Sequence, residues 1–379
     1  MSLQIERVET DRQLREFIKV AWKVYEADPH WVPWMYHERL DFFDKQKNPF
    51  FEHSEADYFI ARRHGETVGS IAAILNHRHN QFHEENVAHF GVFEVLNDPE
   101  AAAALLEAAC DWARARGVDK ILGPMTLSTN DECGLLIDGF DSPPVVLMTY
   151  NPPYYSDFIK TAGFTKAMDL WAWHAEIAEV VNNMPDKVQR VVGKVRDRFN
   201  LTIQHLNLKD WDNEVALVKR IYNSAWSRNW GFVPMTDAEF SHLADGLKPV
   251  LDPAIAFKVY KGEEPVGFAL SLPNVNEPLH RFRPKPSVLS SYLGGAYMLL
   301  NRYRTKGLRV LVLGVIEEFR GQGIDALLYY ETAKAALARG YHWAEASWIL
   351  EANDMMNRGL EMMGAKVYKT YRIYEKSLT

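Results

Sequence analysis

The chain has 379 residues and a formal net charge of −7, with 47% hydrophobic and 25% charged residues. These proportions are typical of a globular protein with a sizeable core, and the length favours two domains of about 100–200 residues each. The acidic balance argues against a general nucleic-acid binder, so we expect no nucleic-acid partner. Cys110 and Cys133 are too few for a disulfide framework, and no Cys/His pair has zinc-ligand spacing, so we expect no metal.

The first residues, MSLQIERVETDRQ, are charged from the start and have no apolar signal region. No apolar run reaches the roughly 20 residues needed to span a bilayer. We therefore expect a cytoplasmic protein.

Strand and turn patterns recur along the chain in the same order. Residues 59–69 (FIARRHGETVG) and 257–267 (FKVYKGEEPVG) are strand-forming runs that a Gly-Glu turn interrupts and Val-Gly closes, which indicates a hairpin in each half. A further apolar run follows each hairpin, at 90–95 and at 310–316. The hairpin and the next strand are therefore predicted twice.

Helical segments continue the repeat. Residues 99–116 and 323–339 carry apolar residues at helical spacing, and both lead into Ala-Arg-Gly, a C-terminal glycine stop. A strand, an asparagine with a short helix, and a closing strand follow in each half. The order β-β-β-α-β-α-β after a helical region predicts an α/β sandwich twice. The later pieces are 121–125, Asn151 and 170–174 in the first half, and 344–349, Asn353 and 367–374 in the second.

The predicted fold is therefore α/β, with two tandem mixed-sheet sandwiches and flanking helices. Pro185 and the polar residues around it suggest a boundary, which gives domains of 1–184 and 185–379. Residues 188–198 form a predicted connecting helix. The alternative is a single large mixed sheet in which the two hairpins resemble each other by chance.

The most informative segment is 310–328 (VLVLGVIEEFRGQGIDALL), where an apolar strand leads through Arg320, Gly321, Gln322 and Gly323 into a helix. Such a loop directs successive backbone N–H groups at an anion, and the helix N-terminus adds unsatisfied donors and its positive dipole end. The glycines permit close approach of phosphates, and Arg320 can add a charged donor. The alternative is an ordinary strand-to-helix turn with glycines for tightness.

This segment resembles the acetyl-CoA pyrophosphate loop of the GNAT N-acyltransferase superfamily, whose pattern is Arg/Gln-x-x-Gly-x-Gly/Ala. Arg320 and Gly323 fit, whereas Asp325 stands where a small residue is expected. The resemblance implies two GNAT-like domains and an acyl-CoA donor, as acetyl-CoA or a longer thioester, without a metal. The frequent Tyr general acid falls on Leu360, which cannot donate a proton. The implied CoA-binding residues are Leu313, Val315, Arg320, Gly321, Gln322, Gly323, Ile324, Asp325 and Asn353.

A narrower resemblance extends over nearly the whole chain. Residues 28–33 (DPHWVP), 48–53 (NPFFEH), 150–155 (YNPPYY) and 229–234 (NWGFVP) resemble the bacterial ceramide synthase-like group of tandem GNAT proteins. That resemblance implies transfer of a fatty acyl chain from CoA to the amine of a sphingoid base.

The corresponding loop of the first half lacks these features. Residues 96–99 (LNDP) contain no glycine and no arginine, and Asp98 with Pro99 is typical of a helix N-cap and first turn. We therefore expect the first half not to bind CoA. Its polar insert, 126–144, is interpreted either as a loop lining an acceptor pocket or as a solvated surface loop.

Acyl transfer to an amine requires a group that removes the amine proton and donors for the developing oxyanion. No carboxylate lies within 310–315. The candidates for catalysis or acceptor positioning, each of which also has a purely structural interpretation, are Glu345, Glu132, Asn130 and Asn276.

Residues 279–309 carry seven Lys or Arg residues and no acidic residue. Between two basic clusters lies the apolar or small stretch 288–300. This pattern suits an interfacial segment on anionic lipid, with the protein peripheral at the inner membrane face. The alternative is a buried excursion whose charges meet acidic groups elsewhere. The basic residues are Arg281, Arg283, Lys285, Arg302, Arg304, Lys306 and Arg309.

The leading prediction is an acyl-CoA-dependent N-acyltransferase, acting on a long-chain or sphingoid-type amine. The alternatives are acetylation of a small metabolite amine and a non-catalytic acyl-CoA sensor, which Leu360 favours. An aminoacyl-tRNA-dependent transferase is a third class, against which the glycine loop and the acidic charge both count. The acceptor, the acyl length and the oligomeric state stay open.

Overall fold

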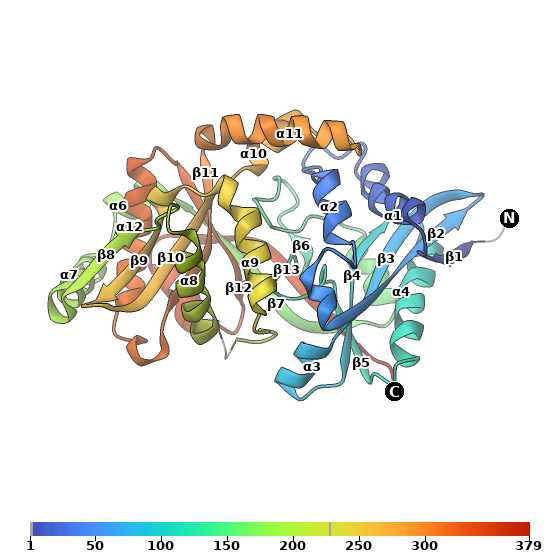
Figure 1. The fold of residues 1–379 in the computed structure, drawn as a ribbon, viewed down its shortest axis with the longest axis horizontal. Helices are drawn as coiled ribbons and strands as arrows, with labels where there is room; N and C mark the ends of the chain where they lie inside the picture. Colours follow the sequence, from blue (N-terminus) through green and yellow to red (C-terminus); the bar gives the residue numbers. More distant parts are fainter. Residues whose placement is uncertain (1–2, 227–228) are drawn as a thin grey trace. The chain divides into compact units, whose positions relative to one another are not determined.

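The computed structural model describes residues 3–226 and 229–379, and its elements are labelled in Figure 1. Contacts divide the chain into two compact units that do not follow chain order. Unit 1 is Met1–Leu170, Leu279–Tyr297 and Lys369–Thr379, and unit 2 is Trp171–Pro278 and Met298–Tyr368. The predicted boundary at 184/185 concerns the sequence repeat and stays a prediction.

Unit 1 is built on strands in the order β1-β2-β3-β4-β5-β13, with β6 also paired to β13. All these pairs are antiparallel except β4 with β5. Its elements are β1 (Gln4–Arg7), α1 (Asp11–Val24), α2 (Tyr36–Phe42), β2 (Ser54–Arg63), β3 (Glu66–Asn76), α3 (His77–His83), β4 (Val87–Val95), α4 (Pro99–Arg114), β5 (Lys120–Gly123), β6 (Leu135–Asp138), α5 (Tyr155–Thr161) and most of β13 (Lys366–Ser377).

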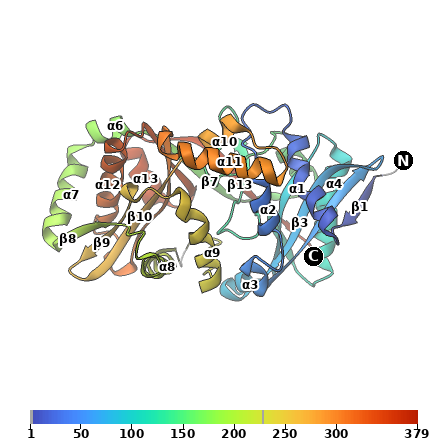
Figure 2. The ribbon, with the colours of Figure 1, turned by 45° about the horizontal axis from the view of Figure 1, so that its top comes forward.

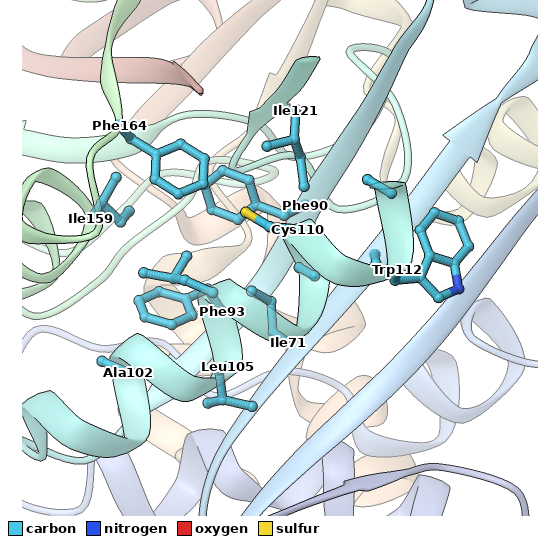
Figure 3. Packing of buried hydrophobic residues seen from close by; sticks show 14 of the residues in the cluster. Ile71, Phe90, Phe93, Ala102, Leu105, Cys110, Trp112, Ile121, Ile159 and Phe164 are labelled. Carbon is cyan, nitrogen blue, oxygen red and sulfur yellow. The ribbon is translucent and has the colours of Figure 1, made fainter. Parts of the chain in front are cut away.

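Alternation along β3 gives unit 1 two apolar layers, because successive side chains in a strand point to opposite faces. Ile71 and Ala73 belong to the core beneath α4, whereas Ala72 and Ile74 pack with residues of α1 and α2. Figure 3 shows part of the first layer, where Leu105 of α4 lies near strand residues of the same cluster. Helices therefore cover both faces of this sheet.

Unit 2 has strands in the order β7-β12-β11-β10-β9-β8, with β11 and β12 parallel. Helices α7 and α12 lie on one face and α8 on the other (Figure 2). Its elements are the second half of β7 (Thr165–Glu176), α6 (Ile177–Asn182), α7 (Asp186–Phe199), β8 (Leu201–His205), α8 (Trp211–Trp226), α9 (Asp237–Leu247), β9 (Ala256–Lys261), β10 (Glu264–Pro273), β11 (Gly307–Val315), α12 (Ile324–Ala338), β12 (Trp343–Leu350) and α13 (Asp354–Met362).

The elements of the sequence repeat form as predicted, but the two closing strands change places. Strand β13 pairs with β5 and β6 in unit 1, whereas β7 neighbours β12 and belongs to unit 2 from Trp171 onward, so the prediction that each half is closed by its own last strand is wrong. The predicted hairpins are β2–β3 and β9–β10, and the predicted helices are α4 and α12. The predicted connecting helix is α7, two residues longer at its start and one at its end. The remaining excursion folds as α10 (Asn276–Phe282) and α11 (Val288–Asn301), so the apolar stretch 288–300 is helical.

Candidate functional site

Strands β11 and β12 pair along four residues and then separate. The register runs from Gly307 with Trp343 to Val310 with Ala346, and the structure describes no pairing of these two strands beyond it. On its other side β11 stays paired to β10 as far as Val315. The edge of β11 that faces β12 therefore presents backbone N–H and C=O groups after Val310, including those of the predicted residue Leu313.

A bulge coincides with this separation. Leu270 of β10 pairs with Val312, and Ser271 pairs with Val310, so Leu311 is an extra residue on β11. A bulge bends its strand and increases the local twist, which accounts for the divergence of β11 from β12. The sequence carries no mark at Leu311 itself, although Gly314 in the same run is a residue that often accompanies a bulge.

The loop after β11 holds its glycines in the left-handed region. Gly321 has φ +67° and Gly323 has φ +88°, conformations that favour glycine. A Cβ at Gly321 would meet nothing within 4 Å, whereas one at Gly323 would lie 2.8 Å from Val191 of α7. The first-turn N–H groups of α12, at Ile324 and Asp325, have no intrahelical acceptor. The end of β11, the loop and the start of α12 therefore form one candidate anion-binding surface.

Two polar side chains of this loop turn back onto the protein. Arg320 donates through Nη2 to the carbonyls of Ser224, at 3.1 Å, and Ala225, at 2.6 Å. These carbonyls lie in the last turn of α8, where a cation is favoured by the helix dipole. Gln322 donates to the Glu318 carbonyl at 2.9 Å. In this arrangement the backbone N–H groups of the loop are the donors available to an anion. A contact between Arg320 and a phosphate stays a prediction.

Asn353 and Leu360 have structural roles here. Asn353 is the N-cap of α13 and accepts from the Met356 N–H at 3.3 Å. Leu360 is buried in an apolar cluster with Trp173 and Ala346. A contact between Asn353 and CoA stays a prediction, and the proton donor has to come from another residue.

Glu345 lies on β12 with no exposed surface. Ala344 and Ala346 pack in clusters with residues of α12 and α13, so strand alternation places Glu345 on the face opposite α12. Its carboxylate accepts hydrogen bonds from the Ser347 hydroxyl and from the Tyr368 phenol of β13. A buried carboxylate and a phenol are thus in direct contact within unit 2.

An imidazole adjoins this pair. The His174 ring centroid lies 5.5 Å from that of Tyr368 and 5.5 Å from that of Trp343. His174 Nε2 is 3.1 Å from Glu176. Sequence reasoning missed Tyr368 and His174, although both lie in predicted closing strands. The signal that would identify them is the lateral order of the strands, which a single sequence does not show.

Unit 1 holds Glu132 and Asn130 in a separate polar network. Glu132 binds Arg39 of α2 through both oxygens, at 2.6 and 2.5 Å. The Asn130 N–H donates to Ser128 at 3.1 Å. The insert is not a solvated surface loop over its first residues, because Ser128 and its neighbours are buried. Asn276, the fourth candidate, is the first residue of α10.

A buried carboxylate that sequence reasoning missed lies in the same unit. Glu94 of β4 accepts from the Tyr155 hydroxyl at 3.0 Å, and burial raises its pKa to about 8. It sits beside a strand irregularity, since Val92 has φ +47° although β-branched residues rarely adopt positive φ. The apolar run 90–95 predicts the strand, but no sequence pattern singles out its one carboxylate.

In unit 1, strands β4 and β5 also separate after a short pairing, but another part of the chain lies against the edge of β4 that this exposes. Strands β4 and β5 pair from Val87 to His89, and β4 continues to Val95. The Met125 N–H donates to the Phe90 carbonyl at 2.8 Å, and a Cβ at Gly91 would lie 1.6 Å from the Met125 carbonyl oxygen. The chain itself occupies the β4 edge at this point.

The start of α4 is a structural cap, as predicted. Asp98 is the N-cap, accepts from the Ala101 N–H at 3.1 Å and pairs with Arg63. Across residues 3–226 and 229–379, no group of three or more His, Cys, Asp or Glu side chains is placed to hold a metal ion. Nor does that part of the chain contain a helix both long and apolar enough to cross a membrane.

Comparison with solved structures places this architecture in a known class. The chain aligns over its full length with a tandem GNAT protein from the clavulanic acid biosynthesis pathway, at 11% identity and TM-score 0.59, covering 99% of that chain. A GCN5-related N-acetyltransferase from Sphaerobacter thermophilus aligns over 99% of this chain and 96% of its own, at 11% identity and TM-score 0.53. The fold is that of tandem GNAT proteins.

Sequence relatives narrow the class. The chain is 36% identical over 384 residues to a bacterial ceramide synthase of Caulobacter vibrioides, covering 99% of this chain and 98% of that one. It is 34% identical over 372 residues to Protein YghO of Escherichia coli, covering 96% and 93%. No protein-family model matches the chain. The chain belongs to the family of these two relatives and is an acyltransferase with the GNAT fold.

Proposed function

We propose that the protein transfers a fatty acyl group from CoA to the amine of a long-chain, sphingoid-type base. The open edge of β11 beside the glycine loop carries the donor half of this proposal. The full-length similarity to a bacterial ceramide synthase supports the acceptor half.

The donor binds unit 2 in this proposal. The N–H groups of residues 321–325 hold the pyrophosphate, and the glycines allow the phosphates to approach the backbone. The pantetheine arm pairs with the edge of β11 along 311–315, as an added strand would, although the Val315 carbonyl already accepts from Arg320 Nε at 3.4 Å. Its thioester then lies between diverging strands, where backbone N–H groups can stabilise the oxyanion of the transition state.

The face opposite α12 supplies the proton transfers. The neutral amine attacks the thioester carbonyl, so a C–N bond forms as the C–S bond breaks. Glu345 accepts the proton that the nitrogen loses, directly or through a water, and Tyr368 donates a proton to the departing thiolate. Their direct hydrogen bond allows Glu345 to return a proton to Tyr368 after each turnover. Glu132, Asn130 and Asn276 remain candidates for acceptor recognition.

The test is an assay with purified protein, long-chain acyl-CoA and a sphingoid base, in which free CoA and the N-acyl product are both quantified. We expect equal amounts of the two products, and a preference for long-chain over acetyl donors. Preference for acetyl-CoA with small amines would replace the proposal by metabolite acetylation. Stoichiometric acyl-CoA binding without turnover on any amine would favour the sensor, which the apolar setting of Leu360 supports.

A sphingoid-type acceptor partitions into membranes, so an anionic membrane surface is the partner that this proposal adds. The enzyme would then act as a peripheral protein at the cytoplasmic face of the membrane.

A further inference from the structure

Helix α11 directs large apolar side chains outward. Leu289 is 70% exposed, Tyr292 61%, Leu293 54% and Leu300 81%, and Ala296 is exposed as well. Their spacing of three or four residues places them on one helix face, which we call the apolar face of α11. A helix on a water-soluble surface normally turns such a face inward.

The opposite face of α11 is made of small residues that fix its orientation. Ser291 and Gly294 are buried. Ser291 accepts from the His37 N–H at 3.3 Å, and a Cβ at Gly294 would lie 3.3 Å from both Phe282 and Pro284. A side chain at Gly294 would press against these two residues, which would have to shift by a few tenths of an ångström. The helix therefore packs through its small side and leaves its large residues outside.

The segment before α11 is anchored on unit 1. Trp22 donates through its indole N–H to the Pro284 carbonyl at 2.9 Å, and Arg283 donates to the Asp28 carbonyl at 3.0 Å. His280 Nε2 lies 2.6 Å from the Pro29 carbonyl. Part of the DPHWVP motif thus holds the α10–α11 excursion in place. These bonds hold the part of the excursion that belongs to unit 1.

The charges around α11 indicate which kind of partner its apolar face fits. No acidic residue occurs within 279–309, in a chain of net charge −7. Three of the seven basic residues do not contribute fully, since Arg309 is buried against the Ser347 carbonyl, Arg302 donates to the Leu299 carbonyl and Arg283 donates to the Asp28 carbonyl. A wide apolar face with basic ends is complementary to anionic headgroups above acyl chains. The exposed basic residues are Arg281, Arg283, Lys285, Arg304 and Lys306.

We propose that α11 docks the protein onto an anionic lipid surface. The apolar face enters the boundary between headgroups and acyl chains, and the basic ends contact lipid phosphates. The helix has 14 residues and lies in the interface without crossing it. The purpose of this docking rests on the proposed function, because it brings the enzyme to a membrane-resident amine, but the docking itself is measured without turnover.

The first experiment is sedimentation of the full chain with vesicles of phosphatidylcholine, with or without phosphatidylglycerol. We expect binding that requires phosphatidylglycerol and weakens with salt. The triple variant Arg281→Glu, Lys285→Glu and Arg304→Glu should bind more weakly by a factor on the order of a hundred or more, since each lost basic residue costs about fivefold and each new glutamate adds repulsion. Arg283 is left intact because it anchors the excursion. The matched control changes three exposed basic residues elsewhere, Arg12, Lys160 and Lys209, to Glu.

The second experiment separates a lipid surface from a protein partner. Replacing Leu289, Leu293 and Leu300 with Ser should abolish the vesicle binding that survives at high salt, while replacement of the exposed Phe82 and Leu337 should not. Equal binding of both variants would overturn the proposal. The proposal would also be overturned if the wild type bound no vesicle, or if it self-associated through these leucines and bound none. Turnover on a detergent-dispersed acceptor should be the same in every variant as in the wild type. If the wild type binds vesicles but shows no turnover on this acceptor, the proposed function is wrong and the docking proposal still holds.

Discussion

Strand β4 of unit 1 and strand β11 of unit 2 are both irregular, and the units differ in what lies beside that strand. In unit 1, Gly91 and Glu94 of β4 are three residues apart, whereas their partners Ala72 and Ser70 on β3 are two apart, so β4 contains one extra residue. In unit 2 the extra residue is Leu311 of β11. Both strands then leave their parallel neighbours. In unit 2 the structure describes no strand against the freed edge, whereas in unit 1 Met125 bonds to it.

The loops differ in the same sense. Gly321 and Gly323 of unit 2 adopt positive φ before α12, whereas the side chain of Asp98 caps α4 in unit 1. An acidic cap satisfies the donors that a phosphate would use and adds a negative charge. The comparison supports one CoA site per chain. The fold repeats down to a bulge, whereas the features proposed to bind the donor occur in one copy.

The largest effect is expected at Glu345. Glu345→Gln should lower kcat by about 10²–10⁴-fold, the range that a positioned acid or base contributes, with CoA affinity unchanged. Tyr368→Phe should act in the same direction. Steady-state turnover and calorimetric CoA binding measure the two quantities separately.

The control is the buried carboxylate of the other unit. Glu94→Gln should leave turnover near the wild-type rate at pH 7. If Glu94→Gln abolishes turnover and Glu345→Gln does not, unit 1 is the catalytic half and the comparison between the units is reversed.

The next effect concerns the loop. Gly321→Val should weaken CoA binding on the order of a hundredfold, because its Cβ enters the open space where the phosphates would lie. Left-handed strain at a non-glycine residue costs about 1–3 kcal/mol, so stability should fall modestly. Calorimetric titration measures affinity, and thermal unfolding measures stability.

Gly262→Val is the matched control within unit 2. Gly262 has φ +62° and nothing within 4 Å of an added Cβ, so it carries the same strain away from the loop. It should lose similar stability and keep CoA affinity. Wild-type titration should give one CoA per chain, and two equivalent sites would contradict the difference between the units.

Much of this could be predicted from local patterns. Asp98 and the glycine after residue 116 bracket α4, and the Gly-Glu turns specify both hairpins, because capping and turn chemistry depend on neighbours in the sequence. The glycine loop at 320–323 is likewise predictable, because its pattern lies within a few consecutive residues. These features give the repeat and the location of the candidate donor site.

The rest depends on contacts between distant residues. Tyr368 meets Glu345 through the lateral order of strands, and Trp22 holds a segment more than 250 residues later. Arginine is a residue type that commonly binds phosphate, but the guanidinium of Arg320 donates to carbonyls of a nearby helix. Val92 lies at positive φ against its own propensity, because the surrounding structure determines its conformation.

The free energy of unfolding should depend on pH through Glu94. Burial raises the pKa of Glu94 to about 8 from an ordinary value of 4.5, so the folded state binds this proton more tightly than the unfolded chain. Stability from this group is full below pH 4.5 and declines as the pH rises to 8. Between pH 6 and 8 the decline is about 2 kcal/mol by linkage. Denaturant unfolding should show this slope in the wild type and its absence in Glu94→Gln, and equal slopes would contradict the assignment.

The smallest effect is expected at Glu132. Its carboxylate pairs with Arg39 at a partly buried position, the two side chains being 21% and 13% exposed. Glu132→Ala leaves the guanidinium without that partner, and the expected loss is about 1–2 kcal/mol, below the range for fully buried pairs because water still reaches both groups. If the network only supports unit 1, turnover at saturating acceptor should stay within about twofold of wild type, and the double variant with Arg39→Met should regain stability. If Glu132 also recognises the acceptor, the KM for the amine should rise while CoA affinity stays constant, and the double variant should not restore that KM. The second outcome would extend the chemistry to unit 1 and would limit the contrast between the units to CoA binding.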